Sequence, residues 1–283
     1  MKQILDFTVR SVERVSDKHV LMRLTLPTPL PEMLPGQFVE VRIDGTPDTL
    51  LRRPISINFV DRRQNELWLL VAMVGSGTQW LGSRKAGDIV NCVLPLGNGF
   101  TLPDGETAQD GASSVTASKV LLVGGGVGVA PLLYLGAQLQ QAGHEVTFLL
   151  GGRSAKDVLE LDLFKKYGRV CVTTEDATLG EQGFVTQHSV LAESFDRIYT
   201  CGPTPMMKAV AHYAREHAIW CEASLENLMA CGLGACLCCV EKVKRQESEN
   251  ETQPSGTDSQ ETTNVCVCKE GPVFNINRLL WQS

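Results

Sequence analysis

Residues 120–137 read VLLVGGGVGVAPLLYLGA, a run of eighteen residues with five glycines and no charged side chain. Its length would admit a membrane span, but the glycines and the central Pro131 favour a buried strand, a glycine turn and a helix. Pro131 suits the first turn of that helix, where its missing amide hydrogen is not needed. We therefore predict that this stretch does not span a membrane and that it begins an α/β domain.

From residue 119 onward, the sequence pattern predicts alternating strands and helices. We predict strands near 119–123, 145–150, 169–173 and 197–200, and helices near 130–142, 156–167, 186–193 and 205–218. This alternation predicts an α/β domain over residues 119–220, in which helices cover both faces of a parallel sheet.

The first hundred residues follow a different pattern, in which short apolar runs are separated by turn formers. The runs lie near 5–14, 19–26, 37–43, 54–60, 66–74 and 88–94. Closely spaced short strands predict an antiparallel six-stranded β-barrel over residues 1–100. The small, polar segment 101–118 that follows is interpreted as a linker or loop without an assigned function.

A third region, residues 221–283, contains a cluster of cysteines. Cys231, Cys236 and Cys239 stand in C-x4-C-x2-C spacing among glycines, and Cys268 follows at a distance, as in plant-type [2Fe-2S] proteins. Glycine allows the backbone to approach a cluster closely. On spacing alone, a structural zinc site and simple packing remain alternatives. Cys238 and Cys266 are spare thiols, and either could replace a ligand in this assignment.

The cysteine region is interrupted by residues 244–264, which contain no strongly hydrophobic side chain. Such a segment buries too little apolar surface to offset the entropy lost on ordering. We predict a mobile polar insertion.

Charge and composition exclude several classes of function. Lys and Arg number 26 against 32 Asp and Glu, so the net charge of −6 argues against nucleic acid or an anionic membrane as a partner. Residues 1–6 lack the apolar core of a signal peptide, so we expect a reducing, cytoplasmic compartment. Cysteines there are more often metal ligands, redox groups or packing residues than disulfides.

Two motifs of the α/β domain predict a nucleotide site. The glycine turn Gly124, Gly125, Gly126 and Gly128 opens a helix, whose free amides and dipole favour a diphosphate. It departs from the G-x-G-x-x-G fingerprint, because Val129 occupies the last glycine position. Cys201, Gly202 and Pro203 lie where the last strand meets the last helix, at the edge where ligands approach a parallel sheet.

Further polar residues follow other strands. Arg153 comes after the second strand of the α/β domain, where a ribose or its 2′-phosphate would lie, although an ordinary solvated arginine fits equally well. In the barrel, Arg52-Arg53-Pro54-Ile55-Ser56 and Gly75-Ser76-Gly77-Thr78 together could hold a pyrophosphate. A nicotinamide passes a hydride and an iron-sulfur cluster passes single electrons, so a flavin is needed between them.

Taken together, these motifs resemble the iron-sulfur electron transfer subunits of B-type, NAD-dependent dihydroorotate dehydrogenase, within the ferredoxin reductase-like superfamily. The resemblance spans nearly the whole chain. It rests on the following segments: 53–56, 77–78, 124–132, CGPTPMM at 201–207, MACGLGAC at 229–236 and CKEGPVF at 268–274.

The resemblance implies three sites. It implies FAD on the barrel, contacted by Arg53, Pro54, Ile55, Ser56, Leu70, Val71, Ala72, Gly77 and Thr78. It implies NAD(H) as co-substrate near Gly124, Gly125, Gly126, Gly128, Cys201, Gly202 and Pro203. It implies a [2Fe-2S] cluster bound by Cys231, Cys236, Cys239 and Cys268.

The resemblance also implies a partner, a catalytic subunit that contains FMN and converts dihydroorotate to orotate, in a heterotetramer with two copies of each chain. This chain would then hold no orotate site, and we predict no catalytic acid or base, because hydride transfer depends mainly on stacking two rings. The insertion 244–264 departs from the family pattern by lengthening the gap before Cys268.

Two other functions remain open. The chain could be a self-contained NAD(P)H reductase or a subunit of a hydrogenase-like complex, which would keep the cofactors and change the electron acceptor. In a different class, it could be a zinc-stapled interaction module without catalysis.

Overall fold

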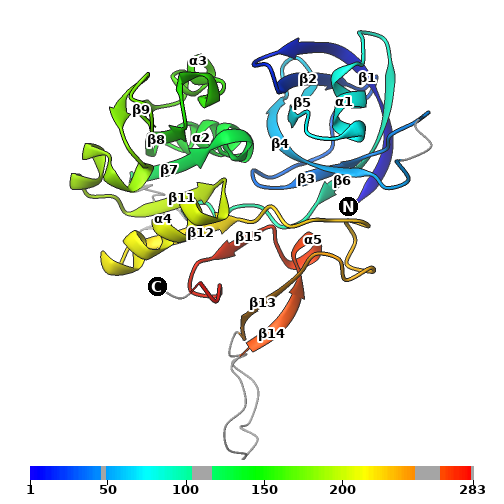
Figure 1. Cartoon of the computed structure of the whole chain (residues 1–283). Coiled ribbons are helices and arrows are strands. Elements are labelled where there is room, and N and C mark those ends of the chain that lie inside the picture. Colours follow the sequence, from blue (N-terminus) through cyan, green and yellow to red (C-terminus); the bar gives the residue numbers. More distant parts are fainter. Residues whose placement is uncertain (46–48, 104–116, 246–261, 282–283) are drawn as a thin grey trace, which may run out of the picture.

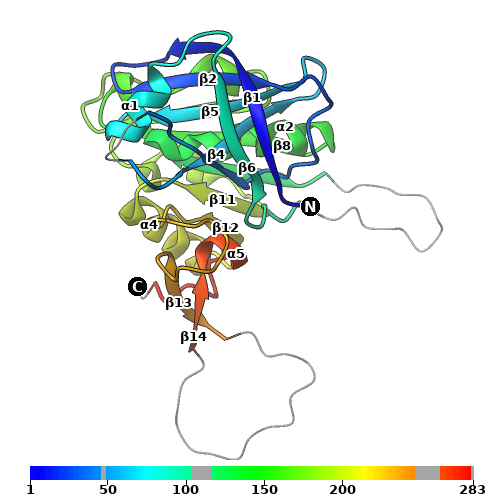
Figure 2. The same cartoon turned by 90° about the vertical axis from the view of Figure 1, so that its right-hand side faces the viewer.

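A computed structural model describes residues 1–45, 49–103, 117–245 and 262–281. The interiors of the predicted linker 101–118 and of the predicted mobile insertion 244–264 lie outside these residues. The chain forms a β-barrel and an α/β layer side by side, with the cysteine region below both (Figure 1). The view from the side shows the same three parts (Figure 2).

The six predicted strands of the first region form a closed antiparallel barrel in the order β1-β2-β5-β4-β3-β6, which confirms the predicted fold. Alternate side chains, such as Val39, Ile57 and Leu69, fill its interior. Helix α1 (Ser76–Gly82) follows the fifth strand, where the sequence predicted only a glycine turn. The strands are β1 (Gln3–Arg14), β2 (His19–Thr25), β3 (Phe38–Val41), β4 (Arg53–Asp61), β5 (Glu66–Ala72) and β6 (Ile89–Leu96).

The predicted parallel sheet is also confirmed, with strand order β10-β9-β8-β7-β11-β12-β15. Helices α2 (Ala130–Gln141) and α4 (Thr204–Glu216) lie on opposite faces of it (Figure 1). From β7, the next strands in the sequence are added on one side as far as β10, and β11 then pairs with β7 on its other side. This reversal of strand order creates a crevice at the carboxyl ends of β7 and its neighbours. The parallel strands are β7 (Lys119–Gly125), β8 (Glu145–Gly152), β9 (Arg169–Thr174), β10 (Glu181–Gln182), β11 (Arg197–Cys201) and β12 (Trp220–Ser224).

Two predicted helices are wrong. Instead of a helix over 156–167, the chain forms a 3₁₀ turn at Ala155–Asp157 and the short α3 (Leu161–Phe164). Glu160 between them is left-handed, with φ 56°, and its side chain accepts a hydrogen bond from the buried Asn58 at 2.8 Å. The predicted helix over 186–193 is two 3₁₀ turns, because His188 between them is extended.

The region beyond residue 221 is partly built into the same sheet. Strand β12 pairs with β11, and β15 (Val273–Asn275) runs antiparallel to β12 at the edge. Residues 225–239, which we call the cysteine loop, lead from β12 to the hairpin of β13 (Val240–Lys244) and β14 (Thr262–Cys266). Helix α5 (Val267–Glu270) follows the hairpin. The predicted boundary at residue 221 stays a prediction.

Within the described ranges, no helix is both long and apolar enough to cross a membrane. The stretch 120–137, which has the length of a span, is divided between β7, a 3₁₀ turn (Gly126–Val129) and α2.

Candidate cofactor and nucleotide sites

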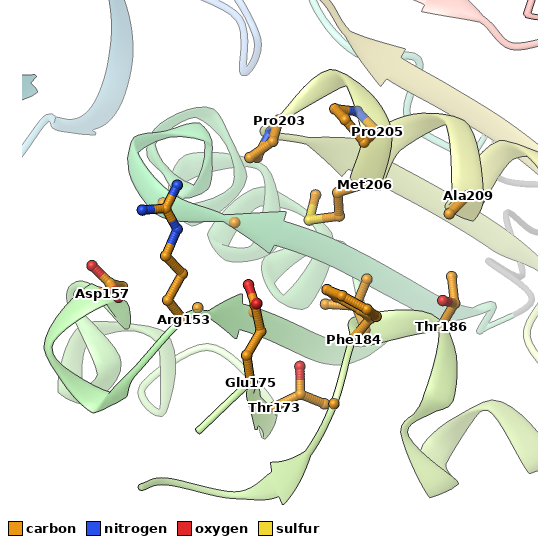
Figure 3. A pocket seen from close by; sticks show the side chains of 16 residues that line it. Arg153, Asp157, Thr173, Glu175, Phe184, Thr186, Pro203, Pro205, Met206 and Ala209 are labelled. Carbon is orange, nitrogen blue, oxygen red and sulfur yellow. The ribbon is translucent and has the colours of Figure 1, made fainter. Parts of the chain in front are cut away.

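A cavity of about 600 Å³ opens at the carboxyl ends of β7, β8 and β9 and is closed by the start of α4 (Figure 3). Three of the residues predicted for the dinucleotide line it, namely Gly125, Gly126 and Pro203. We refer to this space as the nucleotide cavity. Side chains that the sequence did not single out, among them Glu175 and Phe184, form its outer part.

The predicted glycines also allow the segments around the nucleotide cavity to pack closely together. A Cβ atom on Gly128 would lie 2.4 Å from the Cα of Gly202, so only glycine lets these two turns meet. A Cβ on Gly125 would lie 2.8 Å from the sulfur of Met206, at the start of α4. Gly126 has φ 58°, which glycine adopts without strain.

A second cavity of about 380 Å³ lies between the barrel, the glycine turn and the segment 225–229. Seven of the residues predicted for the flavin line it: Arg53, Pro54, Ile55, Ser56, Leu70, Ala72 and Thr78. We refer to it as the barrel cavity. Val71 lies between two of these residues on β5, so its side chain is on the opposite face of the strand, where it is buried in the barrel core.

The glycine turn separates the two cavities. Gly126 lines the nucleotide cavity, whereas Val127 and Ala130, just beyond it, line the barrel cavity. The two cavities are therefore neighbours that share this turn.

The two arginines of the barrel motif have different surroundings. Arg52 is tied to β6, because its guanidinium donates to the Oδ1 of Asn91 at 2.6 Å and to the Asn91 carbonyl at 3.1 Å. Among the described residues, Arg53 donates only to the nearby carbonyls of Leu51 and Arg52. It packs over Gly77, where a Cβ would lie 2.7 Å from its Nε. Gly77 thus makes room for Arg53 at the rim of the barrel cavity.

Cys201 lies behind both cavities and is fully buried. Burial raises the pKa of its thiol well above the ordinary value, so the group stays protonated. Its Sγ donates to the Oε1 of Glu226 at 3.9 Å, and Glu226 lines the barrel cavity. Sequence analysis missed Glu226, which follows β12 and carries no motif.

Backbone amides surround the sulfurs of the cysteine loop. The amides of Leu233 and Ala235 both donate to the Sγ of Cys231 at 3.4 Å. The amide of Gly234 donates to Cys268 at 3.1 Å, and that of Cys268 donates to Cys239 at 3.4 Å. Amide donors of this kind stabilise thiolates that bind iron, so the loop fits an iron-sulfur cluster.

The thiols of the four predicted ligands interact as two separate pairs. Cys236 interacts with Cys231 through its thiol, and Cys239 interacts in the same way with Cys268. Burial acts to raise the pKa of Cys231, but hydrogen bonds from three loop amides and from Cys236 lower it to about 6. Two pairs of thiols match a [2Fe-2S] cluster, in which each iron takes two protein ligands.

The spare cysteines take other positions. Cys266 ends β14, and its thiol donates to the carbonyl of Gly234 at 3.8 Å, while Cys238 is exposed. In the part of the chain that the structure describes, no three His, Cys, Asp or Glu side chains converge on a single point.

Glu40 of β3 lies directly beneath the cysteine loop. A Cβ on Gly232, which has φ 65°, would lie 2.6 Å from the Cγ of Glu40. The carboxyl group is fully buried, and neither oxygen has a hydrogen-bond partner among the described residues. Burial raises its pKa to about 7, although Arg52 opposes this shift. Nothing in the strand pattern singled out this residue.

Comparison with known proteins identifies two parts of the chain. Residues 122–212 match the family of oxidoreductase NAD-binding domains. Residues 226–253 match the iron-sulfur cluster binding domain of dihydroorotate dehydrogenase B.

Two curated relatives carry the same name, dihydroorotate dehydrogenase B (NAD(+)), electron transfer subunit. The protein of Shouchella clausii is 38% identical over 247 residues, which cover 87% of this chain and 86% of the relative. That of Desulforamulus reducens is 35% identical over 288 residues and covers both chains completely.

Solved structures show the same architecture. An NADH-dependent reduced ferredoxin-NADP oxidoreductase, studied for flavin-based electron bifurcation, has a TM-score of 0.77 at 27% identity, over 97% of this chain and 90% of that one. The ferredoxin reductase of carbazole 1,9a-dioxygenase shares the fold, with a TM-score of 0.62 at 20% identity, over 77% of this chain and 67% of the other.

Proposed function

The chain belongs to the family of electron transfer subunits of NAD-dependent dihydroorotate dehydrogenase B, and we propose that its two cavities and its cysteine loop form one electron path. It is an oxidoreductase component that uses NAD(H), FAD and a [2Fe-2S] cluster. Of these groups, NAD(H) exchanges a hydride, the cluster exchanges single electrons, and FAD does both.

The observation that carries this proposal is the position of the barrel cavity. It shares the glycine turn with the nucleotide cavity on one side, and on the other it is bounded by Leu228 and Met229, which belong to the cysteine loop. FAD in the barrel cavity would therefore lie between the other two sites, in the order that the chemistry requires.

The residues of the chain supply binding and orientation. We propose that Arg53, Ser56 and Thr78 hold the FAD diphosphate by charge and hydrogen bonds, and that Leu70, Ala72 and Pro54 contact its apolar parts. Gly125 and Gly126 would let the dinucleotide diphosphate approach the backbone amides. Cys231, Cys236, Cys239 and Cys268 would bind the cluster.

We propose that the electrons continue to or from FMN in a separate catalytic subunit, which converts dihydroorotate to orotate, within a heterotetramer of two copies of each chain. The cysteine loop supports this, because it concentrates exposed apolar side chains. Four of the thirteen exposed large hydrophobic residues of the described chain fall within residues 228–240: Leu228, Leu233, Leu237 and Val240. A solvent-facing apolar group around redox thiols suits a subunit interface.

We place the complex in the cytoplasm, where thiols stay reduced. None of the ten cysteines forms a disulfide in the structure, even though six of them are close in sequence, between residues 231 and 268.

Co-purification with the catalytic subunit tests this function. We expect a complex with two copies of each chain, in which NADH drives the reduction of orotate only when both subunits are present. Matched assays of each subunit alone provide the control. If this chain isolates alone and an FMN-containing partner does not accelerate orotate reduction, the proposed partnership with a dihydroorotate-converting subunit is wrong.

A further inference from the structure

We propose that Glu226 accepts the proton that the flavin in the barrel cavity releases when its electrons pass to the cluster. This inference rests on the proposed function, because it assigns a further residue to the middle site of the electron path. It concerns the step after hydride transfer. The sequence predicted that hydride transfer itself needs no acid or base, and that prediction is unaffected.

The electron and proton counts require such a group. NADH transfers a hydride, which is two electrons with one proton, so that NADH and FAD give NAD⁺ and FADH⁻. Two successive transfers of one electron to the cluster then convert FADH⁻ to FAD, and an N–H bond of the ring breaks to leave one proton. Because the cluster takes up the electrons alone, this proton must leave through the protein or its water.

Glu226 is the one side chain of the barrel cavity, among those that the structure describes, that can accept this proton. The two arginines of the lining remain protonated, and hydroxyl and amide groups are too weakly basic near neutral pH. The polar side chains that line the cavity are Arg52, Arg53, Ser56, Thr78, Glu226 and Asn227.

The contacts of the Glu226 carboxyl leave it able to accept a proton. Its Oε1 accepts from the thiol of Cys201 at 3.9 Å, and no other hydrogen bond or ion pair of this carboxyl occurs within the described residues. The side chain is open to the barrel cavity, yet protein surrounds the carboxyl at longer range and raises its pKa above the ordinary value. A carboxyl with a raised pKa is a better general base than an ordinary one.

The other titratable and charged groups around Glu226 keep their charge near neutral pH. Cys201 at the end of β11 retains its proton, because burial raises the pKa of its thiol well above the ordinary value. Arg52 and Arg53, from the barrel side of the cavity, stay positively charged. A pH dependence of proton release from this cavity therefore reports the titration of Glu226.

The backbone on both sides of Glu226 is held in place. The amide of Leu225 donates to the carbonyl of Pro272 at 2.9 Å. The side-chain amide of Asn227 donates to the Oε2 of Glu241 in β13 at 3.0 Å. These contacts hold the start of the cysteine loop, which carries Glu226, between β13 and the segment before β15. A fixed position suits a group that must meet its reaction partner in a defined geometry.

Glu226→Gln keeps the shape of the side chain and removes the proton acceptor. The full chain with its FAD and cluster is reduced anaerobically by one equivalent of NADH per flavin, and ferricyanide, which takes single electrons, then reoxidises it in stopped flow. We expect Glu226→Gln to keep its FAD and iron and to be reduced by NADH at a rate within threefold of the wild-type rate. Its flavin should be reoxidised at least tenfold more slowly at pH 8.

The pH profile and the solvent isotope effect distinguish proton transfer from a structural role. Reoxidation of the wild-type flavin should slow as the pH falls through the raised pKa of Glu226, because a protonated carboxyl cannot accept, and it should be at least twofold slower in heavy water. Glu226→Gln should show neither dependence, and Glu226→Asp should restore both.

A redox titration of the flavin provides a measurement without turnover. Reduction adds negative charge beside Glu226 and favours its protonation, so the flavin potential should fall more steeply with pH in the wild-type chain than in Glu226→Gln. Glu241→Gln is the matched control for both experiments. It removes a carboxylate outside the cavity lining, keeps an acceptor oxygen for Asn227, and should match the wild-type chain in every measurement.

Three outcomes would overturn the inference: equal reoxidation rates in Glu226→Gln and the wild-type chain, slower reoxidation with an unchanged pH profile and isotope effect, or loss of FAD from Glu226→Gln. Failure of the proposed function looks different. If the wild-type chain holds no FAD, or if NADH does not reduce its flavin, the electron path itself is wrong.

Discussion

The amide of Gly234 donates a hydrogen bond to the sulfur of Cys268 at 3.1 Å, although 34 residues separate them in the sequence. This contact closes the cysteine loop against the start of α5. It gives Cys268 an amide donor, whereas Cys266, two residues earlier, donates its own thiol to the carbonyl of Gly234. These opposite hydrogen-bonding roles favour Cys268 over Cys266 as the proposed fourth cluster ligand.

The first prediction concerns the cluster ligands. Cys231→Ser and Cys268→Ser should each lower the iron content from about two atoms per chain to below about half an atom, while flavin absorbance is retained. Cys266→Ser is the matched control and should keep both iron and sulfide. Iron, sulfide and flavin are measured on anaerobically purified chains. Loss of iron in Cys266→Ser, with retention in Cys268→Ser, would reassign the ligand.

The second prediction concerns the barrel cavity. In Gly77→Ala, the new methyl group would lie 2.7 Å from the Nε of Arg53 and must displace that side chain. Since a hydrogen bond to a charged group contributes about 1.5–3 kcal/mol, FAD should bind more than tenfold more weakly. Gly75→Ala is the control, because its methyl group meets nothing within 4 Å and φ is −150°. FAD affinity is measured by flavin fluorescence, and equal affinities would contradict the role of Arg53.

The third prediction concerns stability against pH. Burial raises the pKa of Glu160 from 4.5 to about 7, although a hydrogen bond from Asn58 opposes the shift. Between pH 4.5 and 7 the carboxyl of Glu160 is ionised in the unfolded chain but protonated in the folded chain. Its contribution to the free energy of unfolding is therefore complete below pH 4.5 and is lost as the pH rises through 7. Among the described residues, neither the Oδ1 of Asn58 nor the Oε1 of Glu160 has a hydrogen-bond donor, so nothing there compensates an ionised carboxylate.

Glu160→Gln supplies such a donor and removes the titration. We expect this variant to be more stable than the wild-type chain by about 1–3 kcal/mol at pH 8 and to differ less at pH 5. Asp162→Asn, at an exposed position in the same turn, is the control. Urea unfolding from pH 5 to 8 measures the difference, and a constant gap across this range would show that Glu160 does not titrate as described.

The fourth prediction concerns the subunit interface. Leu237 is 65% exposed in the cysteine loop and has φ 59°, a conformation that aspartate tolerates better than leucine. Leu237→Asp should therefore fold and retain iron, yet bind the catalytic subunit at least tenfold more weakly. Ile89→Asp replaces a comparably exposed side chain on β6 of the barrel and should bind normally. Equal affinities of the two variants, measured by calorimetry, would exclude the loop from the interface.

Much of the fold could be predicted because it depends on local pattern. The alternation of apolar residues in 54–60 and the short apolar run in 66–74 identify strands whether or not their partners are known. The glycine turn after 119–123 identifies a strand that leads into a helix. The helix predicted over 156–167 is interrupted at the left-handed Glu160, whose carboxylate meets Asn58 about a hundred residues away. No window of sequence contains that contact.

The residues of the candidate sites also differ in whether the sequence alone can predict them. The cysteine spacing and the motifs at Arg53, Gly125 and Cys201 predicted the chemistry, because ligand types and glycine turns are patterns of nearby residues in the sequence. Glu175 could have been found from its place directly after a strand of a parallel sheet. Glu40 and Phe184 could not, because their positions depend on contacts between distant segments.

The sequence by itself determined which groups this protein can bind, since donor types, spacing and backbone freedom are local properties. The tertiary structure alone decided the order of the sites: the glycine turn touches both cavities, and the barrel cavity reaches the cysteine loop. The physical reason is that this order arises when a closed barrel and a sheet pack together, and packing joins residues that are far apart in the chain.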